Sequence, residues 1–219
     1  FRRRPWEGLL PRAPLAGKPG KGVIMDNLKP MLADLAKEPF DSPLHIYEWK
    51  WNGLRIIGHV GESVRLQGRS GADFTLQFPE VVEVLRKAVK HPAVIDGEIV
   101  CMGENGLPEF NRVQNRIGKR DPAVIKLMRE RFPAVYQVFD VTSVFGQDIT
   151  VLGKEPATLL QRKDILGNLV VGNGSVKLSA WVDGKGKELY QKAEQLKQEG
   201  IMAKTKSGLY IPGGRVPEW

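Results

Sequence analysis

Two apolar runs, residues 93–102 and 134–144, place the strongest constraint on the fold. "AVIDGEIVCM" and "AVYQVFDVTSV" are rich in β-branched and aromatic residues, which is typical of central strands. Acids interrupt both runs: Asp96 and Glu98 lie in the first and Asp140 lies in the second. Because a buried acid needs a cation, a metal or a hydrogen-bond donor, both strands predict partners elsewhere in the chain.

Further strands and helices complete a mixed pattern. Alternating apolar runs predict strands, apolar residues at helical spacing predict helices, and Gly and charged residues mark the turns. The expected strands cover residues 44–51, 54–60, 63–69, 176–182 and 201–206, and the expected helices cover residues 78–90, 109–117, 157–169 and 187–200. Because strands and helices do not alternate regularly, we expect an α+β domain with two mainly antiparallel sheets flanked by helices.

The chain divides into a basic arm and a domain. Residues 1–22 are rich in Arg, Pro and Gly, which fits a disordered tail and a functional arm equally well. Residues 23–219 suffice for a domain with its own core. Cys101 is the only cysteine and lies in an apolar run. We therefore expect a buried structural thiol, no intrachain disulfide and a reducing, cytoplasmic setting.

The charge balance narrows the range of partners. Lys and Arg number 33 against 25 Asp and Glu, which gives a net charge of +8 and a pI near 9.6. Such a surface favours a polyanion, above all nucleic acid. No apolar run approaches the ~20 residues that span a membrane. The three His residues are scattered and lie beside no Cys or carboxylate cluster, so a zinc site is not expected.

The segment "YEWKWNGLR", residues 47–55, allows two interpretations. Asn52-Gly53 between two alternating apolar runs predicts a tight hairpin, with Lys50 as an outward-facing cation. In the other interpretation Lys50 is a nucleophile at the end of a strand. Taken alone, these residues favour the hairpin.

Glu199 is the second ambiguous residue. It ends the helix expected over residues 187–200, where a carboxylate opposes the helix dipole at a cost of roughly 0.3–1 kcal/mol. A locally unfavourable residue often marks a functional position. Alone, a solvated Glu199 next to a Gly200 cap is the simpler interpretation.

Six short motifs follow one another between residues 48 and 215. They are "EWKWNGLR" (48–55), "GRSG" (68–71), "DGE" (96–98), "VFD" (138–140), "EGIMAK" (199–204) and "YIPGGR" (210–215), followed by Trp219. In this order they resemble the ATP-dependent DNA ligases of the covalent nucleotidyltransferase superfamily. "PMLA" (30–33) and "FNRVQNR" (110–116) are similar to the bacterial and archaeal branch, including ligase domains linked to double-strand-break end joining. The resemblance implies a nucleotidyltransferase adenylation domain, an ATP-grasp-like ligase fold.

The resemblance implies a three-step reaction. Lys50 attacks the α-phosphate of ATP and keeps AMP as a phosphoramidate, AMP passes to the 5′-phosphate of a DNA nick, and the 3′-hydroxyl displaces it. An amine is nucleophilic only when neutral, a form that burial or the neighbouring cations Lys204 and Arg55 favour. Mg²⁺ or Mn²⁺ is also required, with Glu199 and Glu98 as the metal-binding carboxylates.

The resemblance also assigns the residues that bind ATP and AMP. Glu48 contacts the adenine amine, Phe139 stacks on the adenine, and Glu98 holds a ribose hydroxyl. Trp49 belongs to the same set, although packing is its simpler role, and Phe139 has an alternative role in the core.

Three cations complete the assignment. Lys204 neutralises phosphate charge, and Arg55 and Arg69 contact ribose or phosphate. Arg69 also binds the 5′-phosphate of the nick, with a plain turn residue as the alternative. Contacts to DNA phosphates predict binding that weakens steeply with salt.

The chain departs from the family at two places. Asn52 stands where the family normally has Asp, which keeps the turn chemistry but removes a carboxylate near Lys50. The sequence also stops at Trp219, before the phosphate-binding lysines and the oligonucleotide-binding domain that the family carries. We therefore expect an isolated adenylation domain that joins nicks poorly.

Other functions remain open at this point. An RNA ligase or a capping guanylyltransferase is the alternative within the superfamily, and a catalytically weak DNA-binding module is the alternative outside it. The expected partners are nicked double-stranded DNA and end-joining proteins, for a monomer with no membrane attachment.

Overall fold

The computed structural model describes residues 27–216, so the arm expected over residues 1–22 lies outside the described residues. The strands are β1 (Leu32–Ala33), β2 (His45–Trp49), β3 (Leu54–Val60), β4 (Val64–Gly68), β5 (Ala93–Cys101), β6 (Ala134–Val144), β7 (Gln147–Asp148), β8 (Val176–Leu178), β9 (Trp181–Asp183), β10 (Ile201–Thr205) and β11 (Arg215–Val216). The helices are α1 (Pro79–Ala88), α2 (Phe110–Ile117), α3 (Pro122–Arg131), α4 (Leu159–Leu169) and α5 (Gly186–Gln195).

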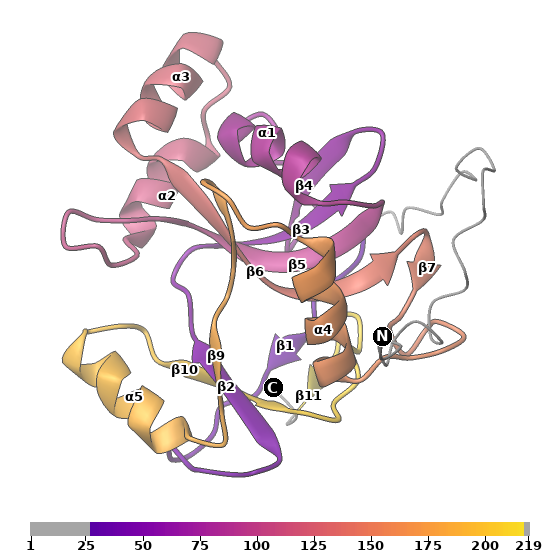
Figure 1. Ribbon diagram of the computed structural model, residues 1–219. Helices are drawn as coiled ribbons and strands as arrows, with labels where there is room; N and C mark the ends of the chain where they lie inside the picture. The colour runs from indigo at the N-terminus through magenta and orange to yellow at the C-terminus, as the bar shows by residue number, and fades with distance from the viewer. Residues whose placement is uncertain (1–26, 217–219) are drawn as a thin grey trace.

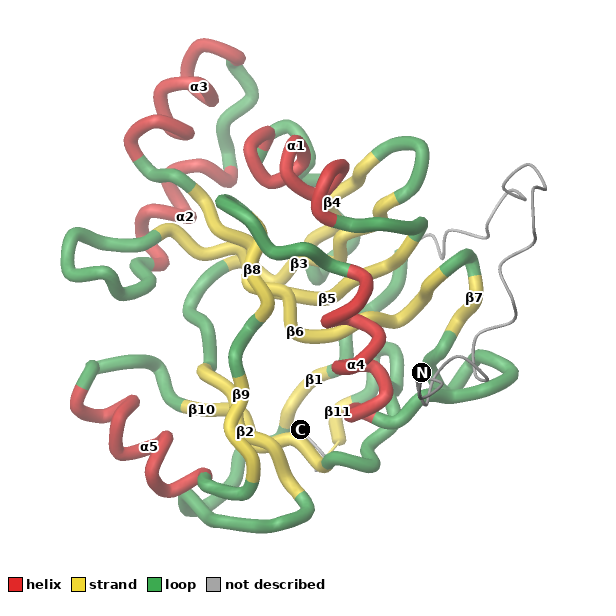
Figure 2. The backbone as a smooth tube through the Cα atoms, in the orientation of Figure 1, coloured by secondary structure: helices red, strands yellow, loops and turns green. Residues whose placement is uncertain are grey.

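Two mainly antiparallel sheets form the body of the domain (Figure 1). The large sheet has the order β4-β3-β5-β6-β7, with β8 paired to β6, and the small sheet has the order β10-β2-β9. Helix α4 packs against β6, and α5 packs against β2 and β10. Helices α1, α2 and α3 lie together at the end of the molecule away from α5 (Figure 2). The expected α+β class is confirmed.

The two strands that the sequence places at the centre of the fold pair with each other in the large sheet. Their apolar side chains are buried against Val81 and Leu85 of α1 and Leu166 of α4. Cys101, at the end of β5, is buried as expected, and burial raises the pKa of its thiol to about 11. A thiol that stays protonated in an apolar site is a poor nucleophile, so Cys101 is a structural residue.

Two of the three acids in these strands, Asp96 and Asp140, form ion pairs with arginines. Arg55 of β3 donates to both oxygens of Asp96, at 2.6 and 2.7 Å. Arg162 of α4 donates to both oxygens of Asp140, at 2.7 and 3.0 Å, and both of these side chains are fully buried. Burial alone would raise the pKa of Asp140, but the Arg162 guanidinium holds it below its ordinary value. For Asp96 and Asp140 these contacts confirm the predicted need for partners.

The hairpin predicted at Asn52-Gly53 is wrong. Strand β2 pairs with β9 and β10 in the small sheet, whereas β3 pairs with β4 and β5 in the large sheet. Residues 50–53 therefore cross from one sheet to the other. The structure describes both Asn52 and Gly53, and neither adopts the positive φ that a type I′ turn needs.

Gly53 is required for a different reason, which gives a testable prediction. A Cβ atom at Gly53 would lie 2.2 Å from the carbonyl oxygen of Ile99 in β5. We expect Gly53→Ala to reduce the free energy of unfolding by about 1–3 kcal/mol, because backbone must move to admit the methyl group. Urea unfolding measures the loss. Gly167→Ala in α4 is the control, since nothing lies within 4 Å of its Cβ position. An unfolding midpoint for Gly53→Ala that matches the wild type would contradict the prediction.

Three further elements differ from the sequence-based expectation. Helix α5 ends at Gln195, and Lys197 and Gly200 then adopt φ values of 52° and 144°, so Glu199 lies in a loop and does not end a helix. The strand expected over residues 176–182 is two strands, β8 and β9, which belong to different sheets. Helix α3 was not expected, although the Asp121 side chain accepts hydrogen bonds from two of its first N–H groups.

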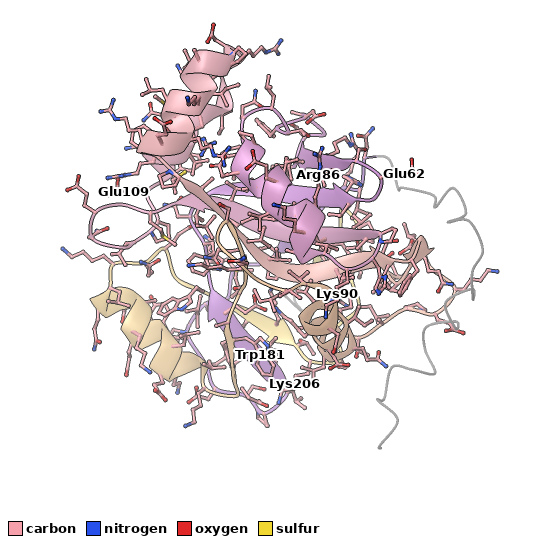
Figure 3. All side chains as sticks on the ribbon, turned by 45° about the horizontal axis from the view of Figure 1, so that its top comes forward. Glu62, Arg86, Lys90, Glu109, Trp181 and Lys206 are labelled. Carbon is pink, nitrogen blue, oxygen red and sulfur yellow. The ribbon has the colours of Figure 1, made fainter. Side chains whose placement is uncertain are left out.

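Charged side chains of both signs are spread over the surface. Figure 3 labels side chains of both signs around the molecule, among them Arg86 and Lys90 and the acids Glu62 and Glu109. Within residues 27–216, no helix is both long enough and apolar enough to cross a membrane.

Candidate active site

A pocket of about 380 Å³ lies where the two sheets face each other. The small sheet supplies Glu48 and Trp49 from β2 and Met202 and Lys204 from β10, and the large sheet supplies Arg55, Glu98 and Phe139. The crossover loop, residues 50–53, forms part of the wall, together with Leu32, Ala33, Phe110 and Glu199. The chain thus brings together residues that are up to 172 positions apart (Leu32 and Lys204).

Lys50 lies on the crossover loop, directly after β2. Its backbone N–H donates to the carbonyl of Gly200 at 3.0 Å, and its ammonium forms an ion pair with the Glu199 carboxylate. The Lys50 side chain is 47% exposed, so of the two influences expected to favour its neutral amine, burial and neighbouring cations, burial is not found. The amine is therefore held at the mouth of the pocket, where an incoming ligand can reach it.

Two carboxylates face the pocket from opposite sheets. Glu199 lies in the loop before β10, and Glu98 lies on β5 directly opposite Arg55 of β3. Burial raises the pKa of Glu98 to about 8, an effect that Arg55 opposes and that Asp96 and Glu199 reinforce. Among the described residues, no group of three or more His, Cys, Asp or Glu side chains is arranged to hold a metal ion. The two carboxylates can therefore supply only part of a metal's coordination shell.

A fixed cation lies on the large-sheet side of the pocket. Asp96 holds the Arg55 guanidinium in the bidentate contact described above, and the hydroxyl of Tyr210 donates to the same carboxylate at 2.6 Å. The backbone N–H of Met31 in turn donates to the Tyr210 hydroxyl at 3.1 Å. The segments before β1 and before β11 therefore help to hold Asp96, and through it Arg55, in place.

Phe139 reaches the pocket because of an irregularity in β6. Asp140 pairs with Asp96 and Val138 pairs with Gly97, so Phe139 is the extra residue of a β-bulge. A bulge turns a side chain out of the regular alternation of a strand. The guanidinium of Arg55 and the ammonium of Lys204 both lie 4.5 Å from the centroid of the Phe139 ring.

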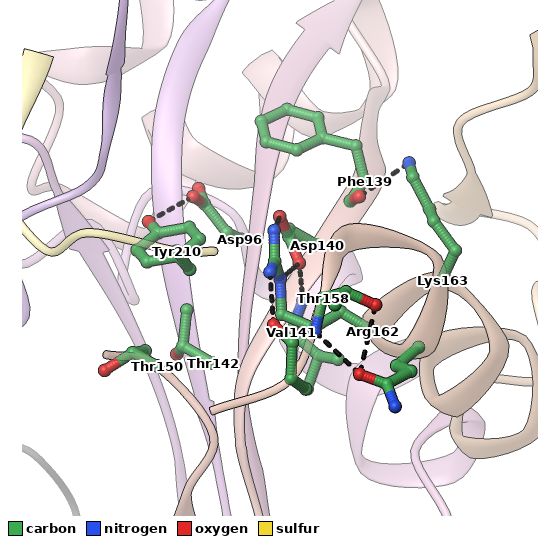
Figure 4. A network of polar contacts seen from close by, with 12 residues as sticks. Asp96, Phe139, Asp140, Val141, Thr142, Thr150, Thr158, Arg162, Lys163 and Tyr210 are labelled. Carbon is green, nitrogen blue, oxygen red and sulfur yellow. Dashed lines mark hydrogen bonds and ion pairs between the residues drawn. The ribbon is translucent and has the colours of Figure 1, made fainter. Parts of the chain in front are cut away.

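Glu48 forms a buried cluster with two lysines. Its carboxylate lies 3.3 Å from the ammonium of Lys204 in β10 and forms a second ion pair with Lys163 of α4. The Lys163 ammonium also donates to the carbonyl of Phe139 at 2.7 Å (Figure 4). Burial lowers the pKa of Lys204 to about 8, although Glu48 opposes the shift. Sequence reasoning missed Lys163, because a lysine within a helix pattern carries no distinguishing signal.

The remaining predicted residues differ in where they lie. Trp49 and Asn52 line the pocket, and Asn52 is exposed at its edge. Trp51 donates from its indole nitrogen to the hydroxyl of Ser179 at 3.0 Å, which ties the crossover loop to the segment between β8 and β9. Arg69 is exposed in the turn after β4 and is not part of the pocket wall.

An amine at the mouth of a pocket of this size, with cations behind it and carboxylates beside it, suits the transfer of a nucleotidyl group to lysine. The fold and the site thus define a nucleotidyltransferase adenylation domain. Residues 30–219 match the family model described as "ATP dependent DNA ligase domain", and the chain belongs to this family. The resemblance drawn from the six motifs is confirmed: the chain is an ATP-dependent DNA ligase adenylation domain.

Curated relatives and solved structures agree with this placement. The DNA ligase of Thermococcus fumicolans is 30% identical over 204 residues, which cover 88% of this chain and 35% of the relative. The LigD protein of Mycobacterium tuberculosis, a multifunctional non-homologous end joining DNA repair protein, is 29% identical over 92% of this chain and 24% of its own length. The chain therefore spans about a third or less of these relatives.

The structural neighbours show the same fold. A mycobacterial DNA ligase D complexed with ATP and MES superposes with a TM-score of 0.69 at 27% identity, over 89% of this chain and 59% of that one. The Chlorella virus DNA ligase-adenylate superposes with a TM-score of 0.58 at 18% identity, over 86% of this chain and 64% of that one, and so supports the fold alone.

Proposed function

We propose that this domain forms a covalent lysyl-AMP on Lys50 and passes the AMP to a DNA nick. The neutral Lys50 amine attacks the α-phosphorus of ATP, a nitrogen–phosphorus bond forms, the bond to the bridging oxygen breaks, and pyrophosphate leaves. The amine proton goes to solvent. The position of Lys50 carries the proposal, because its amine lies at the mouth of a pocket whose wall contains Arg55 and Lys204.

The pocket residues divide between base, sugar and phosphate. Glu48 accepts a hydrogen bond from the adenine amine, and Phe139, together with Trp49, packs against the base. Glu98 holds a ribose hydroxyl. Arg55 and Lys204 neutralise phosphate charge as it develops in the transition state. Stabilisation of such charge by preorganised groups is usually the largest single contribution to catalysis.

The two carboxylates also fit a role in binding Mg²⁺ or Mn²⁺. Carboxylate oxygens are hard ligands of the type that these ions prefer, and Mg²⁺ is often held by one or two carboxylates together with substrate phosphates and water. Burial raises the pKa of Glu98 to about 8, and a bound cation would favour its ionised form. Glu199 and Glu98 would hold the ion. When bound, it supplies positive charge that stabilises the departing pyrophosphate.

DNA enters in the second step. The 5′-phosphate of a nick takes AMP from Lys50, and the 3′-hydroxyl then displaces AMP to seal the strand. Arg69, exposed outside the pocket, is proposed to bind the 5′-phosphate. Because one relative is an end-joining protein, we propose that the domain acts in the repair of DNA breaks and has end-joining proteins as partners. We also propose that it works as a monomer.

Substrate comparison tests this proposal against the alternatives. The chain is first labelled with α-labelled ATP, freed from nucleotide, and then mixed with nicked DNA or nicked RNA of the same sequence. We expect the label to move to the 5′-phosphate of nicked DNA, and to do so less as salt is raised. Transfer to nicked RNA alone would identify an RNA ligase, and labelling by GTP in place of ATP would identify a capping enzyme. A protein that binds DNA but never takes up label would be a weakened DNA-binding module.

Asn52 offers a gain-of-function test. We expect Asn52→Asp to raise the rate of AMP transfer to the protein, because it restores an oriented contact whose loss can cost on the order of 10²-fold. The rate of uptake of α-labelled AMP measures this change. Asn-Gly sequences can deamidate, so an intact-mass measurement of the wild-type preparation is the control. A rate that stays the same or falls would show that the carboxylate has no role here.

A further inference from the structure

We infer that Lys163 is a positioning residue for nucleotide specificity: it fixes Glu48 as an acceptor for an amino group on the base. Lys163 belongs to none of the motifs that pointed to this site, and it does not line the pocket. The inference rests on the proposed function, since it concerns the base of the nucleotide that labels Lys50.

Lys163 makes two contacts behind the pocket wall. Its ammonium forms an ion pair with Glu48 of β2, in the small sheet, and donates to the carbonyl of Phe139 of β6, in the large sheet, at 2.7 Å. The Lys163 side chain is 7% exposed and that of Glu48 is 2% exposed, so water does not screen the pair appreciably. One side chain of α4 thus links the acid to the bulge that presents the aromatic ring.

The backbone that carries Lys163 is itself fixed. The preceding residue, Arg162, is bound in bidentate fashion to Asp140, the residue that follows Phe139 (Figure 4). A capping box between Thr158 and Gln161 closes the first turn of the same helix. Two successive residues of α4 therefore hold two successive residues of β6, and Lys163 has little freedom to leave Glu48.

The two lysines decide what Glu48 can bind. Glu48 forms ion pairs with the ammonium groups of both Lys163 and Lys204, and a carboxylate in such pairs only accepts hydrogen bonds. It therefore matches the amino group at position 6 of adenine and disfavours the carbonyl at position 6 of guanine or hypoxanthine. In a buried site an unmatched polar pair is costly, so such a contact discriminates strongly.

Lys163 can be tested without disturbing the phosphate side of the pocket. Lys204 contacts the pocket and is assigned a role with phosphate, whereas Lys163 lies behind the wall. The full chain is assayed for uptake of label from α-labelled ATP and from α-labelled inosine triphosphate, which carries a carbonyl in place of the amine. The variants are Lys163→Met, Lys163→Gln and Lys163→Arg. Lys126→Met is the matched control, because Lys126 is exposed on α3, which contributes nothing to the pocket.

Lys163→Met is expected to reduce the preference for ATP over inosine triphosphate at least about tenfold, by raising KM for ATP while leaving kcat nearly unchanged. Lys163→Arg should recover most of the preference, and Lys126→Met should behave as wild type. If Lys163→Met does not fold, Lys163→Gln carries the same expectation, since it keeps a donor but removes the charge.

Two results overturn the inference in different ways. Unchanged nucleotide preference in a folded Lys163 variant, with a wild type that takes up label, overturns the role of Lys163 alone. A wild type that takes up no label from any nucleotide overturns the proposed function and this inference with it.

Discussion

Replacing Lys204 by Met is expected to lower the rate of AMP transfer to the protein by about 10²–10³-fold, the usual cost of removing one preorganised group that stabilises transition-state charge. The Lys204 side chain is 2% exposed, lines the pocket and lies 4.5 Å from the Phe139 ring. A cation held in so dry a site interacts strongly with phosphate charge, and Met fills a similar volume without that charge. Initial rates of label uptake from α-labelled ATP measure the loss.

The control for this substitution is Lys206, two residues after Lys204. Lys206 forms an ion pair with Asp183 and hydrogen-bonds to the carbonyl of Pro43, and it does not line the pocket. Lys206→Met should therefore take up label at the wild-type rate. Equal rates for the two variants, both with wild-type thermal unfolding, would show that Lys204 has no part in the chemistry.

Replacing Arg162 by Met is expected to lower the free energy of unfolding by about 3–5 kcal/mol, which is typical when one partner of a buried ion pair is removed. This loss is larger than the one expected for Gly53→Ala. Asp140 and Arg162 are fully buried, and Arg162 also donates to the carbonyls of Ala157 and Gly208, at 2.8 and 3.1 Å. Without the guanidinium, the Asp140 carboxylate remains in the core with no partner of equal strength. Urea unfolding followed by circular dichroism measures the change.

A surface pair gives the matched comparison. Arg129 and Glu83 form an ion pair of similar geometry, at 2.8 Å, with side chains that are 40% and 54% exposed. Because water screens exposed pairs, Arg129→Met should leave the unfolding midpoint almost unchanged. Adding Asp140→Asn to Arg162→Met should recover part of the lost stability, since it removes the stranded charge. A midpoint for Arg162→Met as high as that of Arg129→Met would contradict this interpretation of the buried pair.

Local patterns in the sequence identified most of the strands and helices. The strands predicted over residues 54–60 and 134–144 have the bounds of β3 and β6. Alternation and β-branched content are properties of short windows, so a single sequence contains them in full. The acids inside β5 and β6 were informative for the same reason, because a charge in an apolar run needs a partner wherever the chain then goes.

Pairing between elements could not be predicted in this way. Asn52-Gly53 has the best local signal for a hairpin, yet β2 and β3 pair in separate sheets. Long-range pairing outweighed the turn preference, and a glycine chosen for turn chemistry proved to be needed for its close approach to Ile99. The error matters for the site, because a loop between sheets places Lys50 at the mouth of the cavity they enclose.

Residues in motifs can be identified from the sequence, whereas residues that support them cannot. Glu48, Lys50 and Lys204 were found because their neighbours form recognisable motifs, and the structure brings them to one pocket. Lys163 lies in an unremarkable helix, and its contacts to Glu48 and Phe139 depend on how α4 packs. Neither periodicity nor composition records such a contact. A residue such as Lys163 can therefore be identified only from the three-dimensional structure.

Covalent labelling of Lys50 tests the central claim most directly. The wild-type chain and Lys50→Arg are incubated with α-labelled ATP and Mg²⁺, denatured and analysed by peptide mass mapping. We expect the wild type to carry AMP on the peptide that contains Lys50, and Lys50→Arg to carry none, because a guanidinium that stays protonated cannot act as the nucleophile. Label that persists in Lys50→Arg, or a wild type that never acquires label, would contradict the claim that Lys50 forms the bond to AMP.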